Sequence, residues 1–451
     1  MGLVLQLVET GADSRTRSVD VIEIARPSDL RDIANLGLTL PEAKQLVARV
    51  QQEVVAAQAR DHAALRPDCS SCGGRCHVKD WRSRQVATPF GAVAVRLPRF
   101  LCPGCGRGET GTSWPAHCRS TPELDRLQAH LSALMTYRVA AGVLAHLLPV
   151  AAGTSPETLR GHTLKIGEEL REAAAVEPVA AALPTPAIAL SLDSTFIRSC
   201  HEGERHLEVR VGNAETPGGG RQVFGAVANA GTDVVALIRR ALDTMGRTDD
   251  TELTAFTDGC SGLRSILADA GVTSPPILDW FHVSMRLQHA KQAAEGLPAD
   301  GPDQVQARAA IAAEVERLRW RTWNGKAKDT RITLERIRTL LPAFEGEPAR
   351  KLKRALDAVD RYLRSQSAHL VDYADRHRAG LRVGTSLTEG TANFLVNRRM
   401  AKSQQMRWSR RGADLLLQVR CAIYNGALGP GFGHLFEPAP SQPHPSLAKA
   451  A

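Results

Sequence analysis

Hydrophobic and polar positions alternate with two different periods along the chain. Between Pro41 and Leu65 apolar residues recur every three or four positions, which predicts an amphipathic helix. The same period at 121–170 predicts further helices, among them Pro122–Leu134 and Tyr137–Leu148. From 187 to 281 short apolar runs predict strands with helices between them. The pattern therefore indicates a mixed α/β protein rather than an all-helical one.

The longest strand-like run is Ala187–Phe196, which is nearly continuously apolar, as in a central strand buried on both faces. We expect Leu207–Val211 and Val223–Ala228 to be its antiparallel neighbours. Leu253–Thr257 and Ile277–Phe281 are expected to be further strands of the same sheet. Residues 284–380 return to the helical period and predict a large helical insertion.

These changes of pattern divide the chain into eight segments. The predicted segments are an N-terminal segment and helix at 1–65, a cysteine-rich segment at 66–118, a helical region at 119–171, an Ala- and Pro-rich linker at 172–186, the first part of a strand-containing core at 187–283, a basic helical insertion at 284–380, the C-terminal helices of the core at 381–428 and a disordered tail at 429–451. In the region 119–171, two helices joined by a short turn fit a helix-turn-helix, and an ordinary antiparallel helix pair fits equally well.

Composition narrows the class of protein. Hydrophobic residues make up 43% and charged residues 23% of the 451 residues, an ordinary balance that excludes wholesale disorder. The best apolar stretch, Val139–Gly153, is interrupted by His146 and Pro149, so we expect no membrane span. The N-terminus lacks the features of a signal peptide. We therefore expect a cytoplasmic protein whose nine cysteines are reduced or metal-bound.

Positive charge is concentrated in one part of the chain. Residues 301–420 contain 25 lysines and arginines against 13 acids, a net charge of +12. The rest of the chain contains 32 lysines and arginines and 35 acids, a net charge of −3. The whole chain therefore carries a net charge of +9. This asymmetry favours a polyanionic partner, with nucleic acid first and an anionic membrane surface second.

Two matched cysteine pairs form the clearest local motif. Cys69 and Cys72 are followed by glycines, and so are Cys102 and Cys105. Between the pairs lie two strand-like stretches around a turn at 89–91, which is how a zinc ribbon is built. Four thiolates can close a tetrahedron around one structural Zn²⁺. Three neighbours could be spare ligands but are expected not to be: Cys76, His77 and Cys118.

Two aspartates stand at the ends of apolar strands. Asp193 follows the run from Ile188, and Asp258 follows Leu253–Thr257. Convergent carboxylates form an oxygen-ligand site for Mg²⁺, and two such ions can assist phosphoryl transfer. Either aspartate alone is more simply explained as a turn cap. The pair, on a basic chain with a zinc ribbon, favours catalysis.

Further motifs follow in a fixed order. They are Leu134–Tyr137, Leu144–Pro149, Leu192–Thr195, Phe256–Gly259, Asp279–His282, Met285–Leu287, Glu389–Asn393, Arg398–Met400, Met406–Trp408 and Gly412. Together with the two cysteine pairs, this series resembles bacterial insertion-sequence transposases of the DDE type, in particular the Kra-type insertion-sequence family. The resemblance covers roughly residues 40–428.

The resemblance implies a catalytic domain of the RNase H-like fold, an α/β mixed sheet with flanking helices. It implies that Asp193, Asp258 and Glu389 hold two Mg²⁺ (or Mn²⁺) ions and carry catalysis. His282 and Asn393 are expected to support them. Asn393 lies four residues after Glu389, on the same side of a helix. For His282, an ordinary place at a strand–helix junction remains an equal alternative.

A basic cluster with one aromatic residue follows Glu389. The residues expected to bind DNA are Arg398, Arg399, Lys402, Arg407, Arg410 and Arg411. Their side chains could neutralise phosphates, and Trp408 among them could stack on an unpaired base. A solvated charged face is the alternative for the cluster, and a place in the core is the favoured interpretation for Trp408.

The predicted function is that of a DDE transposase, which cleaves DNA and transfers the strands of an insertion sequence. Its expected partners are double-stranded DNA, the terminal inverted repeats of the element, and a second copy of the chain in a homodimer or larger assembly. We expect it to act at the bacterial nucleoid. One alternative is a non-catalytic zinc-ribbon and helix-turn-helix regulator derived from a transposase, although such a copy should have lost an acid. A structure-selective RNase H-like nuclease is another.

Overall fold

The computed structural model describes residues 1–428 except 11–15, 28, 30, 111, 113, 115–118, 151–154, 180–181, 385–389 and 402–405. The predicted disordered tail at 429–451 and Cys118 therefore lie outside the described residues. The chain divides into two compact units between Glu168 and Glu169. Among the described residues, no helix combines the length and the apolar character that crossing a membrane requires.

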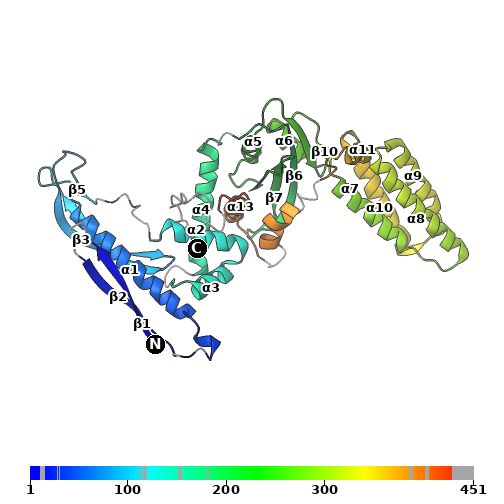
Figure 1. The fold of residues 1–451 in the computed structure, drawn as a ribbon. Helices are drawn as coiled ribbons and strands as arrows, with labels where there is room; N and C mark the ends of the chain where they lie inside the picture. Colours follow the sequence, from blue (N-terminus) through cyan, green and yellow to red (C-terminus); the bar gives the residue numbers. More distant parts are fainter. Residues whose placement is uncertain are drawn as a thin grey trace, which may run out of the picture. The chain divides into compact units, whose positions relative to one another are not determined.

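The first unit contains a β-hairpin, a long helix, a small sheet and a group of helices (Figure 1). Its elements are β1 (Gly2–Thr10), β2 (Thr16–Ala25), the 3₁₀ helix η1 (Ile33–Asn35), α1 (Leu40–Ala64), β3 (His77–Thr88), β4 (Gly91–Leu101), β5 (Gly108–Glu109), α2 (Pro122–Leu134), α3 (Tyr137–Leu147) and the beginning of α4 (Pro156–Val176). Strands β1 and β2 pair with each other, and β3, β4 and β5 form a separate antiparallel sheet.

Helix α1 begins with a capping box. The Thr39 side chain accepts a hydrogen bond from the N–H of Glu42, and the Glu42 carboxylate accepts one from the N–H of Thr39. The apolar side of α1 packs on the β3–β4 hairpin through Val55, Ala59, Val86, Val93 and Val95. Helices α2, α3 and α4 share a separate small core that includes Leu124, Leu144 and Leu159.

The second unit is built around a five-stranded sheet in the order β10-β9-β6-β7-β8. The strands are β6 (Ala187–Arg198), β7 (His206–Glu215), β8 (Arg221–Val227), β9 (Glu252–Thr257) and β10 (Ile277–Leu278). Strand β6 is central, and it pairs antiparallel with β7 and parallel with β9. β10 is parallel to β9, and β8 is antiparallel to β7. The sheet is therefore mixed, and the prediction of a mixed α/β protein is confirmed.

Helices cover the sheet and extend beyond it (Figure 1). They are α5 (Val234–Thr244), α6 (Ser261–Asp269), α7 (Trp280–Glu295), α8 (Pro302–Trp323), α9 (Ala327–Leu340), η2 (Leu341–Ala343), α10 (Gly346–Ser365), η3 (Ser367–His369), α11 (Tyr373–Arg378), the π-helix η4 (Asn393–Ala401) and α13 (Arg410–Tyr424). α5 and α6 share a core with one face of the sheet, and α13 packs on β8.

Helices α7 to α10 form a bundle with its own hydrophobic core. Its members include Leu287, Ile311, Leu318, Ile337, Leu352 and Leu356. The backbone N–H of Trp280, at the start of the bundle, donates to the carbonyl of Val383, beyond its end, at 3.2 Å. The bundle thus leaves the sheet and returns to it at one point, after the short strand β10.

The strand predicted at Ile277–Phe281 is wrong in its second half, because β10 ends at Leu278. The reason is local: the Asp279 side chain accepts a hydrogen bond from the N–H of Phe281 at 2.8 Å and caps helix α7. His282 therefore lies in the first turn of a helix and not at a strand end.

Gly212 in β7 has no room for a side chain. A Cβ atom there would meet the carbonyl oxygen of Ser191 and the ring of Phe224. We expect Gly212→Ala to lower the free energy of unfolding by about 1–3 kcal/mol through overpacking. Gly218→Ala, in the β7–β8 loop where a Cβ would meet nothing closer than 4.0 Å, is the control and should stay near wild type. Chemical denaturation measures both, and equal stability of the two variants would contradict the packing described.

Candidate functional site

Four cysteine sulfurs converge beside the β3–β4–β5 sheet. The Sγ atoms of Cys69 and Cys105 lie 3.4 Å apart, as do those of Cys72 and Cys102, and the pair Cys72–Cys105 is at 3.7 Å. All four sulfurs lie within 4.8 Å of one another. Tetrahedral zinc with Zn–S bonds of about 2.3 Å requires sulfur separations of about 3.8 Å. The four cysteines could therefore hold a structural metal such as zinc.

The two cysteine pairs sit in turns of the same geometry. Gly73 and Gly106 have φ values of +71° and +72°, which L side chains rarely adopt. Each donates its N–H to the carbonyl of the first cysteine of its pair, Cys69 or Cys102, at 3.0 Å. The backbone N–H of Cys105 is the main cause that lowers the pKa of Cys102, to about 7. Backbone N–H groups of the turns lower the pKa of all four thiols, whereas hydrogen bonds with neighbouring cysteines raise the pKa of Cys72 and Cys105 overall.

Replacing Cys102 with serine should remove the metal and unfold residues 66–118. Binding free energy at a structural zinc site is about 10 kcal/mol or more, and it contributes directly to folding. Elemental analysis of purified protein should give one zinc per chain for wild type and none for Cys102→Ser. Limited proteolysis should cut the variant within 66–118. Cys200→Ser, at an exposed cysteine of the second unit, is the control and should keep its zinc. Metal-free wild type that resists protease in this segment would contradict the assignment.

Three aspartates follow paired residues on three adjacent parallel strands of the second unit, β6, β9 and β10. Leu192 of β6 pairs with Thr257 of β9, and Thr257 pairs with Leu278 of β10. The next residue in each case is an aspartate: Asp193, Asp258 and Asp279. Because the three paired residues lie side by side across the sheet, the aspartates that follow them are neighbours. The prediction that Asp193 ends its strand is wrong, because β6 remains paired with β7 as far as Arg198. The sequence pattern alone singled out the first two as an acid pair.

Asp193 is largely shielded from solvent, with 18% of its side chain exposed. Burial raises its pKa to about 6, and the charges of Asp258 and Asp279 add to this effect. His282 acts in the opposite direction, with its Nε2 atom 4.0 Å from Oδ2 of Asp193. His282 therefore lies beside Asp193, in the first turn of α7. This position is compatible both with the expected supporting role and with an ordinary place at a strand–helix junction.

Asp258 is fixed by its own turn and by the helical bundle. Its Oδ1 atom accepts a hydrogen bond from the N–H of Cys260 at 2.8 Å, which is the turn-capping role expected of a lone aspartate. Its backbone carbonyl accepts a hydrogen bond from the Tyr362 hydroxyl of α10, also at 2.8 Å. Gly259 has a φ of +94°, and a Cβ there would lie 2.9 Å from the side chain of Gln366. A glycine is therefore required directly after the second acid.

Asp279 is the most buried of the three, with 1% of its surface exposed. Asp279 also caps α7. The residue before it, Leu278, is fixed by a hydrogen bond of 2.8 Å from the Tyr373 hydroxyl to its carbonyl oxygen. Tyrosines of α10 and α11 thus donate hydrogen bonds to the carbonyls of Asp258 and of Leu278, the residue before Asp279. Motif spacing could suggest Asp279, but only the strand register places it in line with the other two.

The third acid implied by the family resemblance, Glu389, lies outside the described residues, and so does Lys402. Asn393 is half-buried and is the first residue of the π-helix η4. This helix contacts β6, the strand that carries Asp193. Arg420 of α13 donates to the carbonyls of Phe394 and Leu395, the latter at 2.6 Å, and so fixes the start of η4.

The basic cluster divides into exposed and buried members. Arg398, Arg407 and Arg411 are exposed, whereas Arg399 is 4% exposed. Arg410 donates to the carbonyl of Ala228 and pairs with Glu204, and Arg399 lies over the ring of Trp408 at 5.3 Å. The burial of Arg399 argues against its expected contact with DNA.

Trp408 is buried, and its indole N–H donates to the carbonyl of Met400 at 3.0 Å. The favoured interpretation of this residue as part of the core is therefore confirmed. Stacking of its ring on a base is not compatible with this position.

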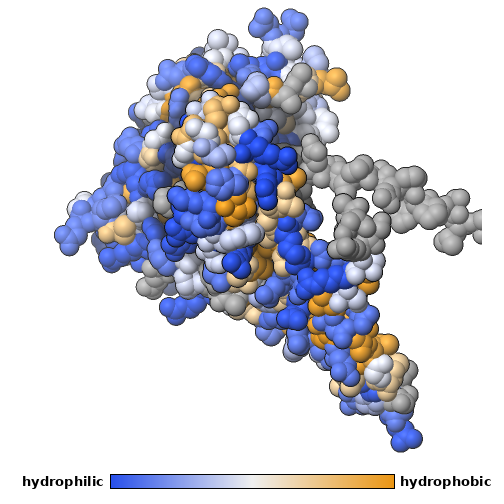
Figure 2. Space-filling model, turned by 90° about the vertical axis from the view of Figure 1, so that its left-hand side faces the viewer, coloured by the Kyte–Doolittle hydropathy of each residue, from blue (hydrophilic) through white to orange (hydrophobic). Residues whose placement is uncertain are grey.

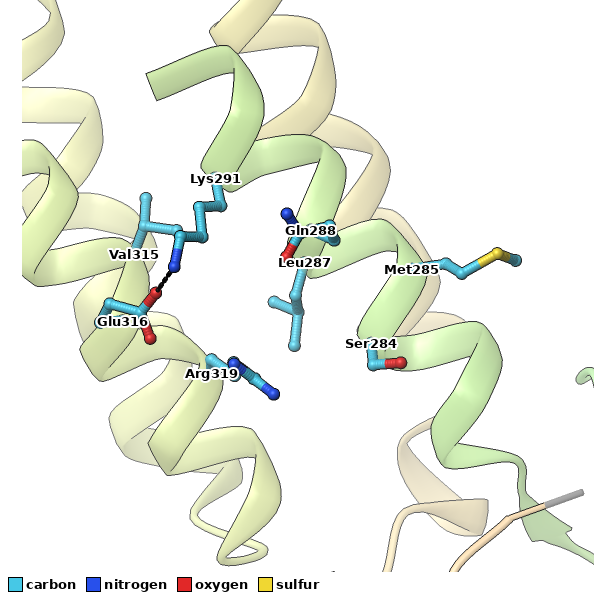
Figure 3. Close-up of a pocket in the computed structure, with 8 residues that line it drawn as sticks. All are labelled: Ser284, Met285, Leu287, Gln288, Lys291, Val315, Glu316 and Arg319. Carbon is cyan, nitrogen blue, oxygen red and sulfur yellow. Dashed lines mark hydrogen bonds and ion pairs between the residues drawn. The ribbon is translucent and has the colours of Figure 1, made fainter. Parts of the chain in front are cut away.

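One hollow of about 250 Å³ lies in the helical bundle, between α7 and α8 (Figure 3). Its lining includes an ion pair between Lys291 and Glu316, at 2.6 Å. None of the three aspartates lines it. We therefore assign the candidate chemistry to the sheet edge and not to this hollow.

Among the described residues, only the four cysteines bring three or more candidate metal-ligand atoms within 4.8 Å of one another. Among these described residues, Asp193, Asp258 and Asp279 therefore do not form a complete set of ligands for one ion. Comparison with models of protein families and with curated proteins finds no match. The function must therefore be argued from the chain itself.

The raised pKa of Asp193 predicts a pH-dependent stability. Its folded-state pKa, about 6, is above the ordinary value of 3.8, so ionisation of this group destabilises the folded state. The loss of folding free energy caused by this ionisation is absent below pH 3.8 and grows between pH 3.8 and about pH 6. Above pH 7 it reaches up to about 3 kcal/mol. In metal-free denaturant unfolding, Asp193→Asn should be more stable than wild type at pH 8, with the difference shrinking towards pH 4.5. Asp250→Asn, an exposed aspartate, is the control. A difference that does not change with pH would contradict this assignment.

Proposed function

We propose that this protein is a DDE transposase with an RNase H-like catalytic domain, which cleaves DNA and transfers strands of an insertion sequence. The observation that carries the proposal is the alignment of two aspartates on neighbouring parallel strands: Asp193 lies within β6, one residue after Leu192, and Asp258 directly follows Thr257, the partner of Leu192 in β9. The mixed sheet with helices on its faces agrees with what the motif resemblance implies. The close approach of three partly or fully buried acids favours a catalytic site over a pure binding module.

The carboxylates supply the chemistry that the proposal needs. Asp193, Asp258 and the implied Glu389 would hold Mg²⁺, which activates a nucleophilic oxygen and stabilises a leaving oxygen when it is bound. With its pKa near 6, Asp193 is mainly ionised at neutral pH but not strongly so, and a cation beside it would complete its ionisation. His282 approaches the same carboxylate and can orient it. Catalysis in such a site is largely positioning and charge neutralisation.

The proposal places DNA binding on exposed basic residues of both units. The β3–β4 hairpin carries the exposed Lys79, Arg82 and Arg96. The region 301–420 carries the net charge of +12, including the exposed Arg398, Arg407 and Arg411. These side chains would neutralise phosphates and position the duplex, whereas the zinc ribbon and helices α2–α4 would contact the terminal inverted repeats.

The direct test uses the full chain and a DNA fragment that contains the sequences flanking its coding region. With Mg²⁺, wild type should cut at the element ends and join them to a target. Asp258→Asn should lower the cleavage rate by at least about a thousandfold, because the change removes a charged ligand at nearly constant volume. Its DNA affinity should be equal to or slightly above that of wild type. Asp250→Asn is the matched control and should cleave normally.

The alternative functions give different results in the same assay. Cleavage without joining would indicate a structure-selective nuclease, and binding without cleavage under Mg²⁺ or Mn²⁺ would indicate a regulator. Normal cleavage by Asp258→Asn would overturn the assignment of the acids. Glu389→Gln, tested alongside, examines the third acid by the same criterion.

A further inference from the structure

Strand β1 has a free outer edge. Within the described part of the chain, no other strand pairs with the backbone groups along this edge. β1 and β2 form a two-stranded sheet. Met1 exchanges both of its backbone hydrogen bonds with Arg26, each at 2.9 Å. Because bonded and outward-facing residues alternate in an antiparallel pair, the next residue and every second one after it direct N–H and C=O outward. These outward-facing residues are Gly2, Val4, Gln6 and Val8.

The register irregularity of this hairpin leaves the edge intact. Leu5 pairs with Ile22 and Gln6 with Asp20, so the extra residue, Val21, belongs to β2. β1 itself is therefore regular along its outer side, and its alternation holds from Gly2 to Val8.

The exposed edge is also apolar and uncharged. Between Gly2 and Val8 there is no charged residue, and the exposed fractions of Leu3, Val4, Leu5 and Val8 are 50, 53, 37 and 59%. Figure 2 shows that hydrophobic side chains reach the surface in patches on the face it presents. Folded proteins usually protect such an edge with charges, prolines or a covering element, because it is a template for pairing with another strand.

We propose that β1 pairs antiparallel with β1 of a second copy of this chain, with the two-fold axis at Leu5. In this register Gly2 faces Val8 of the partner subunit, and Val4 faces Gln6 of the partner subunit. All four are outward-facing residues, so each facing pair exchanges two backbone hydrogen bonds. The result is a four-stranded sheet with an isologous interface.

The side chains favour the same register. Leu3 and Leu5 pair with Ile24 and Ile22 across the hairpin, so they share the face on which these two isoleucines are buried. Leu7, two residues further on, projects to that face as well. The two-fold register places Leu3 against Leu7 of the partner subunit and Leu5 against Leu5 of the partner subunit, which covers an exposed leucine strip.

The distribution of charge along β1 suits pairing with a second copy of the chain. The single charged residue of β1 is Glu9, close to the end of the strand. In the two-fold register the two glutamates lie at opposite ends of the interface, so that no like charges face each other. The backbone pattern is symmetric about Leu5, which is what pairing with an identical strand requires. This inference does not depend on the proposed function.

The oligomeric state of the full chain tests the proposal. Sedimentation equilibrium or light scattering should give a dimer for wild type. Val4→Lys should raise the dissociation constant by about tenfold or more, because a charge on the edge opposes pairing and the loss of even one net hydrogen bond approaches this factor. Val54→Lys, at a residue of α1 that is 40% exposed, is the matched control and should leave the dimer unchanged. A monomeric wild type would overturn the proposal.

Cysteine cross-linking tests the register separately from stability. In a background with Cys200→Ser and Cys260→Ser, Leu5→Cys places two thiols opposite each other at the axis, within disulfide range. Val8→Cys places its two thiols six residues apart along the paired strands, about 20 Å. Mild oxidation should link Leu5→Cys into a covalent dimer and leave Val8→Cys unlinked. Equal linking of both, or a dimeric Leu5→Cys protein that does not link, would assign association to another surface and overturn the proposal.

Discussion

Hydrogen bonding between the parallel strands β6 and β9 determines how Asp193 and Asp258 lie relative to each other. The register Leu192–Thr257 is set by buried apolar side chains on both strands, and a slip of one residue would turn every side chain of a strand to the opposite face. The position of the acids is thus a consequence of core packing. Strand β10 extends the same register and brings in Asp279, although it has only two residues.

This arrangement places like charges together where solvation is poor. Burial and the neighbouring carboxylates raise the pKa of Asp193, while the protein supplies little compensation besides His282 and the N–H of Ser194. Packing alone would be better served by apolar or neutral residues at these positions. Acids that are kept at an edge despite such a cost mark it as a candidate functional site. Tyrosines of the bundle and of α11 hold this edge in place by donating hydrogen bonds to the carbonyls of Asp258 and Leu278.

The sequence is most informative where burial or ligand geometry dictates residue type. The apolar run of β6 predicted a central strand, and the cysteine spacing predicted the four-sulfur cluster. Capping by Asp279 shortened β10, because a side-chain hydrogen bond outweighed the apolar pattern of the following residues. Arg398 and Arg399 are adjacent in sequence, yet one is exposed and the other buried. That difference arises from the winding of η4 against α13 and β6, which no local pattern contains.

The backbone hydrogen bond between Trp280 and Val383 has a consequence for how this protein can change. The chain enters and leaves the bundle at the same place, between Trp280 and Val383. The end of the bundle far from this place therefore does not determine the position of the sheet. Helices α8 and α9 could gain or lose whole turns, or be exchanged for a different module, without displacing the strand ends, since loop closure costs little extra free energy with length. The contacts through Tyr362 and Tyr373 would limit such replacement to parts distal to them. The bundle is therefore the part of the second unit in which new binding specificity could arise with least disturbance of the carboxylates.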